Sequence, residues 1–337
     1  MQAAPTVGIS PPCWPSAATE LAARPAFVSR TARDVFEQAD NLPDWQQIYW
    51  QLSCGQFSGA TQTVEFDGIR LFREAMNQAV DQHGAAPSAH IVIGVPSNIN
   101  GQGYWGGRRI GESSVLTLGR GDDLKFRTPL QSDFTFMTID ARRLQQAAVS
   151  YDIDDIDAVL AALPRVADVA PEVAARFRTL LSMALQSTSP HRASPAYEFL
   201  RAELAEACVQ TLCRSEKTVR YNSSQRVHRY LVNTVRERVL SDMLCPPTVD
   251  QLCKDLKVSR RTLHHAFTSV LDVNPVRYIR LVRLHRARQA LKRATVAPGY
   301  ISEIAADCGF WHLGMFAKYY KEVFGESPSD TAPPQYC

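Results

Sequence analysis

Short runs of apolar residues alternate with polar positions between about Val28 and Asp140. Clusters of Gly, Pro, Asn and Asp separate these runs, a pattern typical of β-strands joined by turns. The segment Asn98–Gly111 holds five glycines and is predicted to be a turn-rich connection. The predicted strands are Val64–Phe66, Ile69–Phe72, His90–Val95, Ser114–Leu118, Leu124–Phe126 and Phe134–Ile139. Many short strands at close spacing predict a β-sandwich or a small cupin-like barrel.

Helical periodicity replaces this alternation from Ala141 to about Lys217. The predicted helices are Arg142–Val149, Asp154–Leu163, Pro171–Gln186 and Pro195–Arg214, two of which open with a first-turn proline. In the last of them Leu200, Leu204, Cys208 and Leu212 recur every four residues. Such an apolar stripe faces either the strands or a second copy of the chain. A further short helix, with an acidic cap, is predicted over Asp44–Leu52.

Two short helices in succession are predicted after residue 247. Thr248 and Gln251 form a capping box, so a helix begins at Val249 and ends near Lys257. Ser259 caps the next helix, which continues to about Leu271. Two helices joined by so short a turn form a helix-turn-helix unit. The second helix presents outward a set of donors that suits the major groove of DNA: Arg260, Arg261, His264, His265 and Thr268.

The same pattern recurs over Ile301–Phe324. Ser302 is predicted to cap the first helix, Gly309 to end it, and a second helix to begin at about His312. The sequence pattern of a single helix-turn-helix unit also occurs in ordinary helical hairpins. Two such patterns in tandem favour a DNA-binding domain over a plain helical bundle. The long helix predicted over Pro275–Arg293 lies between the units and sets their separation. Two recognition helices that contact the same face of B-DNA must lie about 34 Å apart.

Charge supports the same division of the chain. Residues 1–224 carry 20 Lys and Arg against 24 Asp and Glu, whereas residues 225–337 carry 17 against 10. A basic final third, with a net charge of +7, is typical of a unit that binds a polyanion. The Pro- and Ala-rich residues 1–27 are predicted to be disordered and do not resemble a secretory signal. Eight scattered cysteines without a C-x-x-C pair, and no long apolar run, indicate a cytoplasmic protein outside the membrane.

The C-terminal region resembles the AraC/XylS-type transcription regulators. The resemblance rests on Tyr278–Ala287 (YIRLVRLHRA) and on the tail residues Gly309, Phe310, Phe316, Lys321, Phe324, Gly325 and Pro328, and it covers about 105 residues. It implies a cytoplasmic regulator that binds double-stranded DNA, contacts RNA polymerase, senses a small molecule and forms a homodimer. It also implies base contacts from Arg261, His264 and His265 in the first unit and from Leu313, Gly314, Ala317 and Lys318 in the second.

The two units differ in the chemistry that they offer to DNA. Only Lys318 is charged among the matched positions of the second unit, because Leu313, Gly314 and Ala317 have no side-chain group that hydrogen-bonds a base. We therefore expect the first unit to carry most base specificity, and the second to contact phosphates and thymine methyls through Lys318, Lys321 and Leu313. Further phosphate contacts are predicted for Ser259, Arg260 and Thr268. His264 and His265 are not a metal site, since adjacent helical residues diverge by about 100°.

A narrower resemblance is to the regulators of ethanolamine-utilisation operons. It rests on Asp44–Tyr49, Cys54–Gly59, Ser259–Leu263 and Gly309–Gly314, and it implies an activator that responds to ethanolamine together with cobalamin. Ethanolamine is a small cation, which a carboxylate and aromatic rings would recognise. Asp44 or Asp67 with Trp45, Tyr49, Trp50, Tyr104 and Trp105 offer both, although each aromatic taken singly is better explained as core. The D-x-H-x-x-G cobalamin motif is absent, which leaves His83 and His90 as axial-ligand candidates.

The sequence thus predicts an α+β chain. Residues 28–140 form a β-rich effector-binding domain, residues 141–219 a helical linker or dimerisation region, and residues 220–331 an all-α double helix-turn-helix domain, with Arg220–Gln225 as the linker. Three alternatives remain: a regulator of another catabolic pathway, a cupin-like enzyme fused to a DNA-binding domain, and an architectural DNA binder. Catalysis is not predicted, because Val64–Ile139 lacks a cupin metal pattern and the chain has no nucleophile elbow or phosphate loop.

Overall fold

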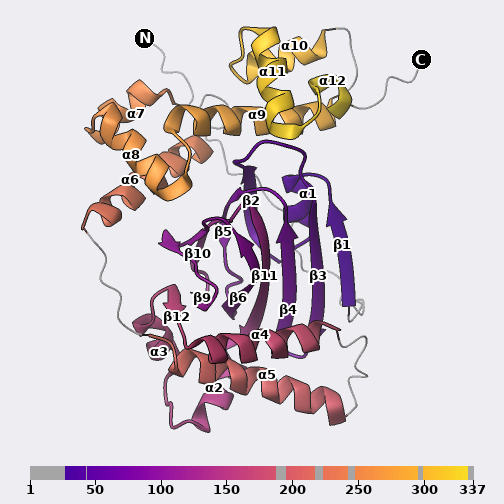
Figure 1. The fold of residues 1–337 in the computed structure, drawn as a ribbon, viewed down its shortest axis with the longest axis vertical. Coiled ribbons are helices and arrows are strands. Elements are labelled where there is room, and N and C mark those ends of the chain that lie inside the picture. The colour runs from indigo at the N-terminus through magenta and orange to yellow at the C-terminus, as the bar shows by residue number, and fades with distance from the viewer. Residues whose placement is uncertain are drawn as a thin grey trace, which may run out of the picture.

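The computed structural model describes residues 27–42, 44–186, 195–216, 223–241, 247–294 and 299–332. In Figure 1 a β-rich domain lies between two helical parts, one against its lower end and one, with the C-terminal helices, above it. The α+β class and the order of its parts are confirmed. The disorder predicted for the N-terminus falls on residues outside the described ranges, apart from Phe27, which opens the first strand.

A seven-stranded antiparallel sheet has the order β1-β3-β4-β11-β6-β9-β12. Its strands are β1 (Phe27–Ala32), β3 (Gly59–Phe66), β4 (Ile69–Met76), β6 (His90–Asn100), β9 (Ser114–Leu118), β11 (Gln131–Asp140) and β12 (Val166–Asp168). On β4, Ile69 and Leu71 face one hydrophobic core while Phe72 faces another. Apolar side chains therefore pack on both faces of this sheet.

A five-stranded antiparallel sheet has the order β2-β5-β10-β7-β8. Its strands are β2 (Gln46–Gln51), β5 (Val80–Ala85), β10 (Asp123–Arg127), β7 (Tyr104–Trp105) and β8 (Arg108–Arg109). An aromatic core lies between the two sheets and includes Phe72, Trp105, Phe126 and Phe136. Face-to-face packing of two sheets around such a core is a β-sandwich.

The prediction of a helix over Asp44–Leu52 is wrong, because this segment forms β2. Tyr49 and Trp50 are both buried, on opposite faces of the strand, so the run has no polar side that would distinguish a strand from a helix. Strands β1, β5, β7, β8 and β12 were not predicted, nor was α1 (Val35–Asp40). β5 reads VDQHGA, and its buried polar residues have partners elsewhere in the fold.

Helices α2 (Ala141–Val149), α3 (Ile156–Ala162), α4 (Pro171–Gln186) and α5 (Pro195–Cys213) cover the outer face of the seven-stranded sheet. Three of them were predicted within a residue of their bounds, while α3 begins two residues late. Leu204, Cys208 and Leu212 are fully buried against this layer. The apolar stripe of α5 therefore faces its own chain, and it gives no support to a dimer contact.

The C-terminal domain is entirely helical in the described residues. It comprises α6 (Ser223–Ser241), α7 (Val249–Leu256), α8 (Arg260–Leu271), α9 (Pro275–Arg293), α10 (Tyr300–Asp307), α11 (Leu313–Phe324) and α12 (Pro328–Thr331). The predicted linker is wrong over Ser223–Gln225, which belong to α6, and its first residues lie outside the described ranges. Val276 of α9 is exposed. No helix in the described ranges is long and apolar enough to span a bilayer.

Candidate DNA interface and effector site

Local hydrogen bonds build the first helix-turn-helix unit as the sequence predicts. The Thr248 Oγ1 accepts from the Gln251 N–H at 3.3 Å, and the Gln251 Oε1 accepts from the Thr248 N–H at 2.8 Å. Lys257 ends α7 in the left-handed conformation, with φ 53°. The Ser259 Oγ then accepts from the Thr262 N–H at 3.0 Å and starts α8. The capping box therefore fixes the start of α7, and the Ser259 cap fixes the start of α8.

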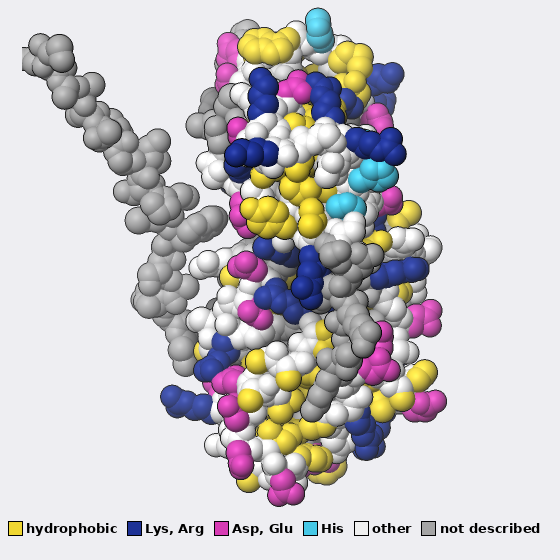
Figure 2. All heavy atoms as spheres, turned by 90° about the vertical axis from the view of Figure 1, so that its left-hand side faces the viewer, with side chains coloured by type: hydrophobic (Ala, Val, Ile, Leu, Met, Phe, Trp, Pro, Cys, Tyr) yellow, Lys and Arg dark blue, Asp and Glu magenta, His cyan; other side chains and the backbone are white. Residues whose placement is uncertain are grey.

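The polar face of α8 is open to solvent. Arg261, His264 and His265 are all exposed. Figure 2 views the molecule from this side and shows the visible His side chains, with several Lys and Arg, in the upper half. Arg260 instead lies against α7, where its Nε donates to the Asp250 Oδ1 at 2.8 Å. Thr268 is half-buried and donates to the His264 carbonyl at 2.9 Å, so α8 offers Arg261, His264 and His265 most freely.

The second unit begins differently from the prediction. Gly299, with φ 83°, is the N-cap of α10, and the Ser302 Oγ donates to its carbonyl at 2.6 Å from within the first turn. Gly309 has φ 79°, a conformation that allows the chain to turn into α11 and that favours glycine. On α11, Phe316, Tyr320 and Val323 are buried as predicted, whereas Gly314, Ala317, Lys318 and Lys321 are exposed. Leu313 is 49 % exposed, and Trp311 before the helix is 81 % exposed.

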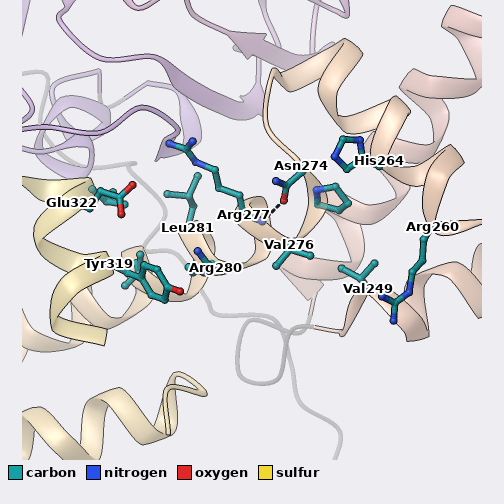
Figure 3. A pocket seen from close by; sticks show the side chains of 13 residues that line it. Val249, Arg260, His264, Asn274, Val276, Arg277, Arg280, Leu281, Tyr319 and Glu322 are labelled. Carbon is teal, nitrogen blue, oxygen red and sulfur yellow. Dashed lines mark hydrogen bonds between the residues drawn. The ribbon is translucent and has the colours of Figure 1, made fainter. Parts of the chain in front are cut away.

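A groove of about 510 Å³ runs between the two units along α9 (Figure 3). His264 and Arg260 line it from α8, and Tyr319 lines it from α11. Arg277 and Arg280 come from α9, and the Arg280 guanidinium lies 4.0 Å from the centre of the Tyr319 ring. The sequence predicts for α9 only that it sets the separation of the two units. The structure adds these two cations to the surface that connects the units.

The outer face of the five-stranded sheet is docked on the C-terminal domain. The buried Asp81 of β5 forms an ion pair with Arg236 of α6 and accepts from the Tyr278 hydroxyl of α9 at 3.1 Å. The His83 Nε2 lies 2.7 Å from the same carboxylate. Burial alone would raise the pKa of Asp81, but Arg236 and His83 outweigh burial and hold it below its ordinary value.

Helix α1 and strand β2 reach the same domain. Lys292 of α9 forms ion pairs with Asp34, the N-cap of α1, and with Glu37, the latter at 3.0 Å. Trp50 of β2 belongs to the hydrophobic core of the C-terminal domain and lies 5.4 Å from the His285 ring, centre to centre. Burial lowers the pKa of His285 to about 4, so this ring is neutral near pH 7. The two domains thus share one core and several charged contacts.

A buried carboxylate lies in the interior of the β-sandwich. Glu74 of β4 is 2 % exposed. Its Oε1 accepts from the Gln38 amide at 3.1 Å and from the Tyr49 hydroxyl at 2.9 Å, and its Oε2 accepts from the Gln82 amide at 3.1 Å. Burial raises the pKa of Glu74, and these three hydrogen bonds only partly offset that effect. Sequence reasoning missed Glu74, because an alternating strand gives no sign that one inward position is acidic.

The structure brings three of the predicted effector residues together and places the others elsewhere. Trp45, Tyr49 and Trp105 line a small cavity together with Glu74. Asp44 lies outside it in an ion pair with Arg70, and Asp67 pairs with Arg143 at 2.7 Å. Trp50 lies on the face of β2 that packs against the C-terminal domain. Tyr104 lies near Arg127 on the outer face of the five-stranded sheet. Three of the predicted aromatics therefore come together, but around a different carboxylate.

The described residues do not fit a corrinoid. His83 is held by Asp81 at the domain interface, and His90 lies at the start of β6, so neither lines a cavity of the β domain. The larger cavity there measures about 360 Å³, near the lower limit for drug-sized ligands. The described ranges also contain no group of three or more His, Cys, Asp or Glu placed to hold a metal ion.

Two helix-turn-helix units joined by α9 define the class of the C-terminal domain, and residues 252–332 match the family described as helix-turn-helix domain. The probable thc operon regulatory protein of Rhodococcus erythropolis is 41% identical over 85 residues, 25% of this chain and 26% of that protein. The XylDLEGF operon transcriptional activator 2 of Pseudomonas putida is 34% identical over 107 residues, 32% of this chain and 63% of that protein. The chain thus spans a quarter to under two thirds of these relatives. ToxT from Vibrio cholerae is 14% identical, with 90% of this chain and 97% of that chain covered and a TM-score of 0.29.

Proposed function

We propose that this protein is a DNA-binding transcription regulator of the AraC/XylS type. The observation that carries the proposal is the exposed polar face of the capped helix α8, paired through α9 with a second helix-turn-helix unit. The names of the relatives support it, since one is an operon regulatory protein and another an operon transcriptional activator.

The two units contribute unequally in this proposal. α8 reads bases through Arg261, His264 and His265, because a guanidinium and imidazoles match the hydrogen-bonding groups of base edges in the major groove. α11 holds the duplex through phosphate contacts of Lys318 and Lys321, and Leu313 touches thymine methyls. Ser259, Arg260 and Thr268 are proposed for phosphate contacts only, and the first two of these also serve contacts within the first unit.

A binding titration on operator DNA, selected from a random pool with the full chain, tests this division. Arg261→Ala is expected to weaken binding by about 1–3 kcal/mol and to relax sequence preference at one position. Lys321→Ala is expected to weaken all sequences equally and to reduce the salt slope by about one. Arg142→Ala, an exposed arginine of α2, is the control and should change neither. Loss of base preference in Lys321→Ala with retention in Arg261→Ala would reverse the assignment.

We further propose that the β domain senses a small molecule and that the protein activates a catabolic operon through RNA polymerase. Ethanolamine is the first candidate effector, on the resemblance of Asp44–Tyr49 and Cys54–Gly59 to the ethanolamine regulators. Thermal melting of the full chain with ethanolamine, with cobalamin and with both tests this choice, because a ligand that binds only the folded state raises the melting temperature. A rise with another catabolic substrate but not with ethanolamine would favour a different pathway.

A further inference from the structure

The Glu74 cluster is a polar site inside an aromatic core. Its small cavity is lined by Glu74 and by five rings, those of Trp45, Tyr49, Phe72, Trp105 and Phe136. All three hydrogen bonds to the carboxylate come from neutral groups. Within the described ranges no salt bridge joins Glu74 to a Lys, Arg or His. An ionised carboxylate buried without a cation costs several kcal/mol, so the site lacks a positive charge.

One acceptor of the cluster also lacks a donor. The Gln38 Oε1 is buried and has no hydrogen-bond partner among the described residues. Buried polar atoms without a partner are rare in native proteins and point to an occupant or a function. A cationic group beside Glu74 would supply the missing positive charge, and aromatic rings stabilise such a cation by the attraction of their π faces.

The cavity connects in structure to a larger one. A pocket of about 360 Å³ opens at the neighbouring edge of the sandwich, and it shares three walls with the Glu74 cavity, namely Leu42, Trp45 and Phe72. The Glu74 cavity itself has room of about 10 Å³, which suits no more than one water. A ligand that enters from the outer pocket must therefore displace the Trp45 ring, which opens the space for its head group beside Glu74.

We propose that Glu74 is the anionic centre of a binding site for a small organic ammonium ion, with Trp45, Phe72, Trp105 and Phe136 around the cation. The ammonium group takes the position beside the carboxylate, and the remainder of the ligand extends toward the outer pocket. The site rests on the proposed function, since it supplies the chemical class of the effector and the residue that recognises it.

The position of the site couples it to the C-terminal domain. The three partners of Glu74 lie on α1, β2 and β5. Each of these elements also contacts the C-terminal domain: α1 through Lys292, β2 through Trp50 in the shared core, and β5 through the Asp81–Arg236 ion pair. Tyr49 and Gln82 are a cross-strand pair, directly beside the pair Trp50 and Asp81. A ligand that moves Tyr49 or Gln82 therefore moves the residues that hold the DNA-binding domain.

Thermal melting and calorimetric titration of the full chain with ethanolamine, choline and tetramethylammonium test the site. A concentration of about 100 times the Kd should raise the melting temperature by roughly 5 °C or more. Glu74→Gln should weaken binding on the order of tenfold or more, because the charge is lost. Tyr49→Phe keeps the carboxylate and should retain binding. Glu172→Gln, at an exposed Glu of α4 outside both pockets, is the matched control.

Tetramethylammonium has no titrating proton and so reports the charge of Glu74 in the unaltered chain. Its affinity should increase with pH as Glu74 ionises above the ordinary range of a Glu. Gln38 and Gln82 do not titrate, and the pKa of Tyr49, the remaining group in contact, is raised well above its ordinary value. This measurement decides the question even where Glu74→Gln does not fold.

The affinity for operator DNA measures the coupling between the cation site and the DNA-binding domain. A saturating cation should change that affinity several-fold in the wild type and in Glu172→Gln, but not in Glu74→Gln. Wild-type binding by Glu74→Gln, loss of binding in Glu172→Gln only, or no response to any of the three cations would overturn the site. A chain that binds operator DNA but no cation retains the proposed DNA function, whereas one that binds cations but no DNA refutes that function alone.

Discussion

At the scale of single residues, Asp81 shows how one buried carboxylate joins distant parts of the chain. It contacts Arg236, Tyr278 and His83, and its side chain is fully buried. In the sequence it is an unremarked acidic position between Val80 and Gln82, because its partners lie about 155 and 197 residues away. A buried charge of this kind is tolerable only when such partners are present.

Asp81→Asn is expected to lower the free energy of unfolding by about 3–5 kcal/mol, because the Arg236 guanidinium then stays buried without its counter-ion. Asp255→Asn breaks the exposed pair with Arg238 and should cost at most about 1 kcal/mol. Denaturant titrations of both variants and the wild type provide the comparison. Equal losses of unfolding free energy in the two variants would show that the buried pair stabilises the fold no more than the exposed pair.

The pH dependence of that difference follows from the sign of the pKa shift. The pKa of Asp81 in the folded protein lies below the ordinary 3.8 of an unfolded Asp. Its ionised form therefore stabilises the fold above that value, and the contribution is lost as the pH falls through the lowered folded value. The gap between the wild type and Asp81→Asn should accordingly be constant near neutral pH and close in acid. A gap that widens in acid would contradict the assignment.

At the scale of elements, local hydrogen bonds decide where the helices of the first unit begin. Thr248 and Ser259 are recognisable in the sequence because a cap bonds residues two or three positions ahead, without help from the rest of the fold. The same reasoning failed at Ser302, where Gly299 takes the cap position and Ser302 bonds back to it. The prediction of a helix in place of strand β2 failed for another reason, because the two faces of this strand are buried in different cores.

Thr248→Ala is expected to destabilise the chain by about 1 kcal/mol, because the Gln251 N–H loses its acceptor. Thr248→Ser keeps the hydroxyl and should remain within a few tenths of a kcal/mol of the wild type. Hydrogen exchange of the α7 amides measures the effect locally, and denaturant unfolding measures it globally. Equal stability of the Ala and Ser variants would show that the capping box does not anchor α7.

At the scale of the whole molecule, the two domains share a hydrophobic core. Trp50, Leu52 and Ala79 from the β domain pack with residues of α6, α8, α9 and α11. Figure 1 shows α9 extending across the top of the β domain, with the helix-turn-helix units at its two ends. The units therefore pack against the β domain, and packed contacts connect the interior of the sandwich to them.

Trp50→Ala is expected to uncouple the domains. Removing a buried Trp costs about 3–5 kcal/mol, and this loss falls on the shared core instead of on either domain alone. Calorimetry should then resolve two melting transitions where the wild type has one, with DNA binding retained. Trp311→Ala is the control, because that ring is 81 % exposed, and it should leave the melting profile unchanged. A single transition in Trp50→Ala would mean that the domains unfold together without this residue.

The sequence by itself determined the features that depend on neighbouring residues: the caps of α7 and α8, the tandem units with α9 between them, six of the twelve described strands, and the polar face of α8. Tertiary structure decided the features that depend on distant residues. It converted Asp44–Leu52 into a strand, turned the α5 stripe inward, buried Glu74 among aromatic rings and placed Asp81 against Arg236. The physical reason is range: a helix cap is complete within one turn, whereas the burial and charge balance of Glu74 are defined only when four elements meet.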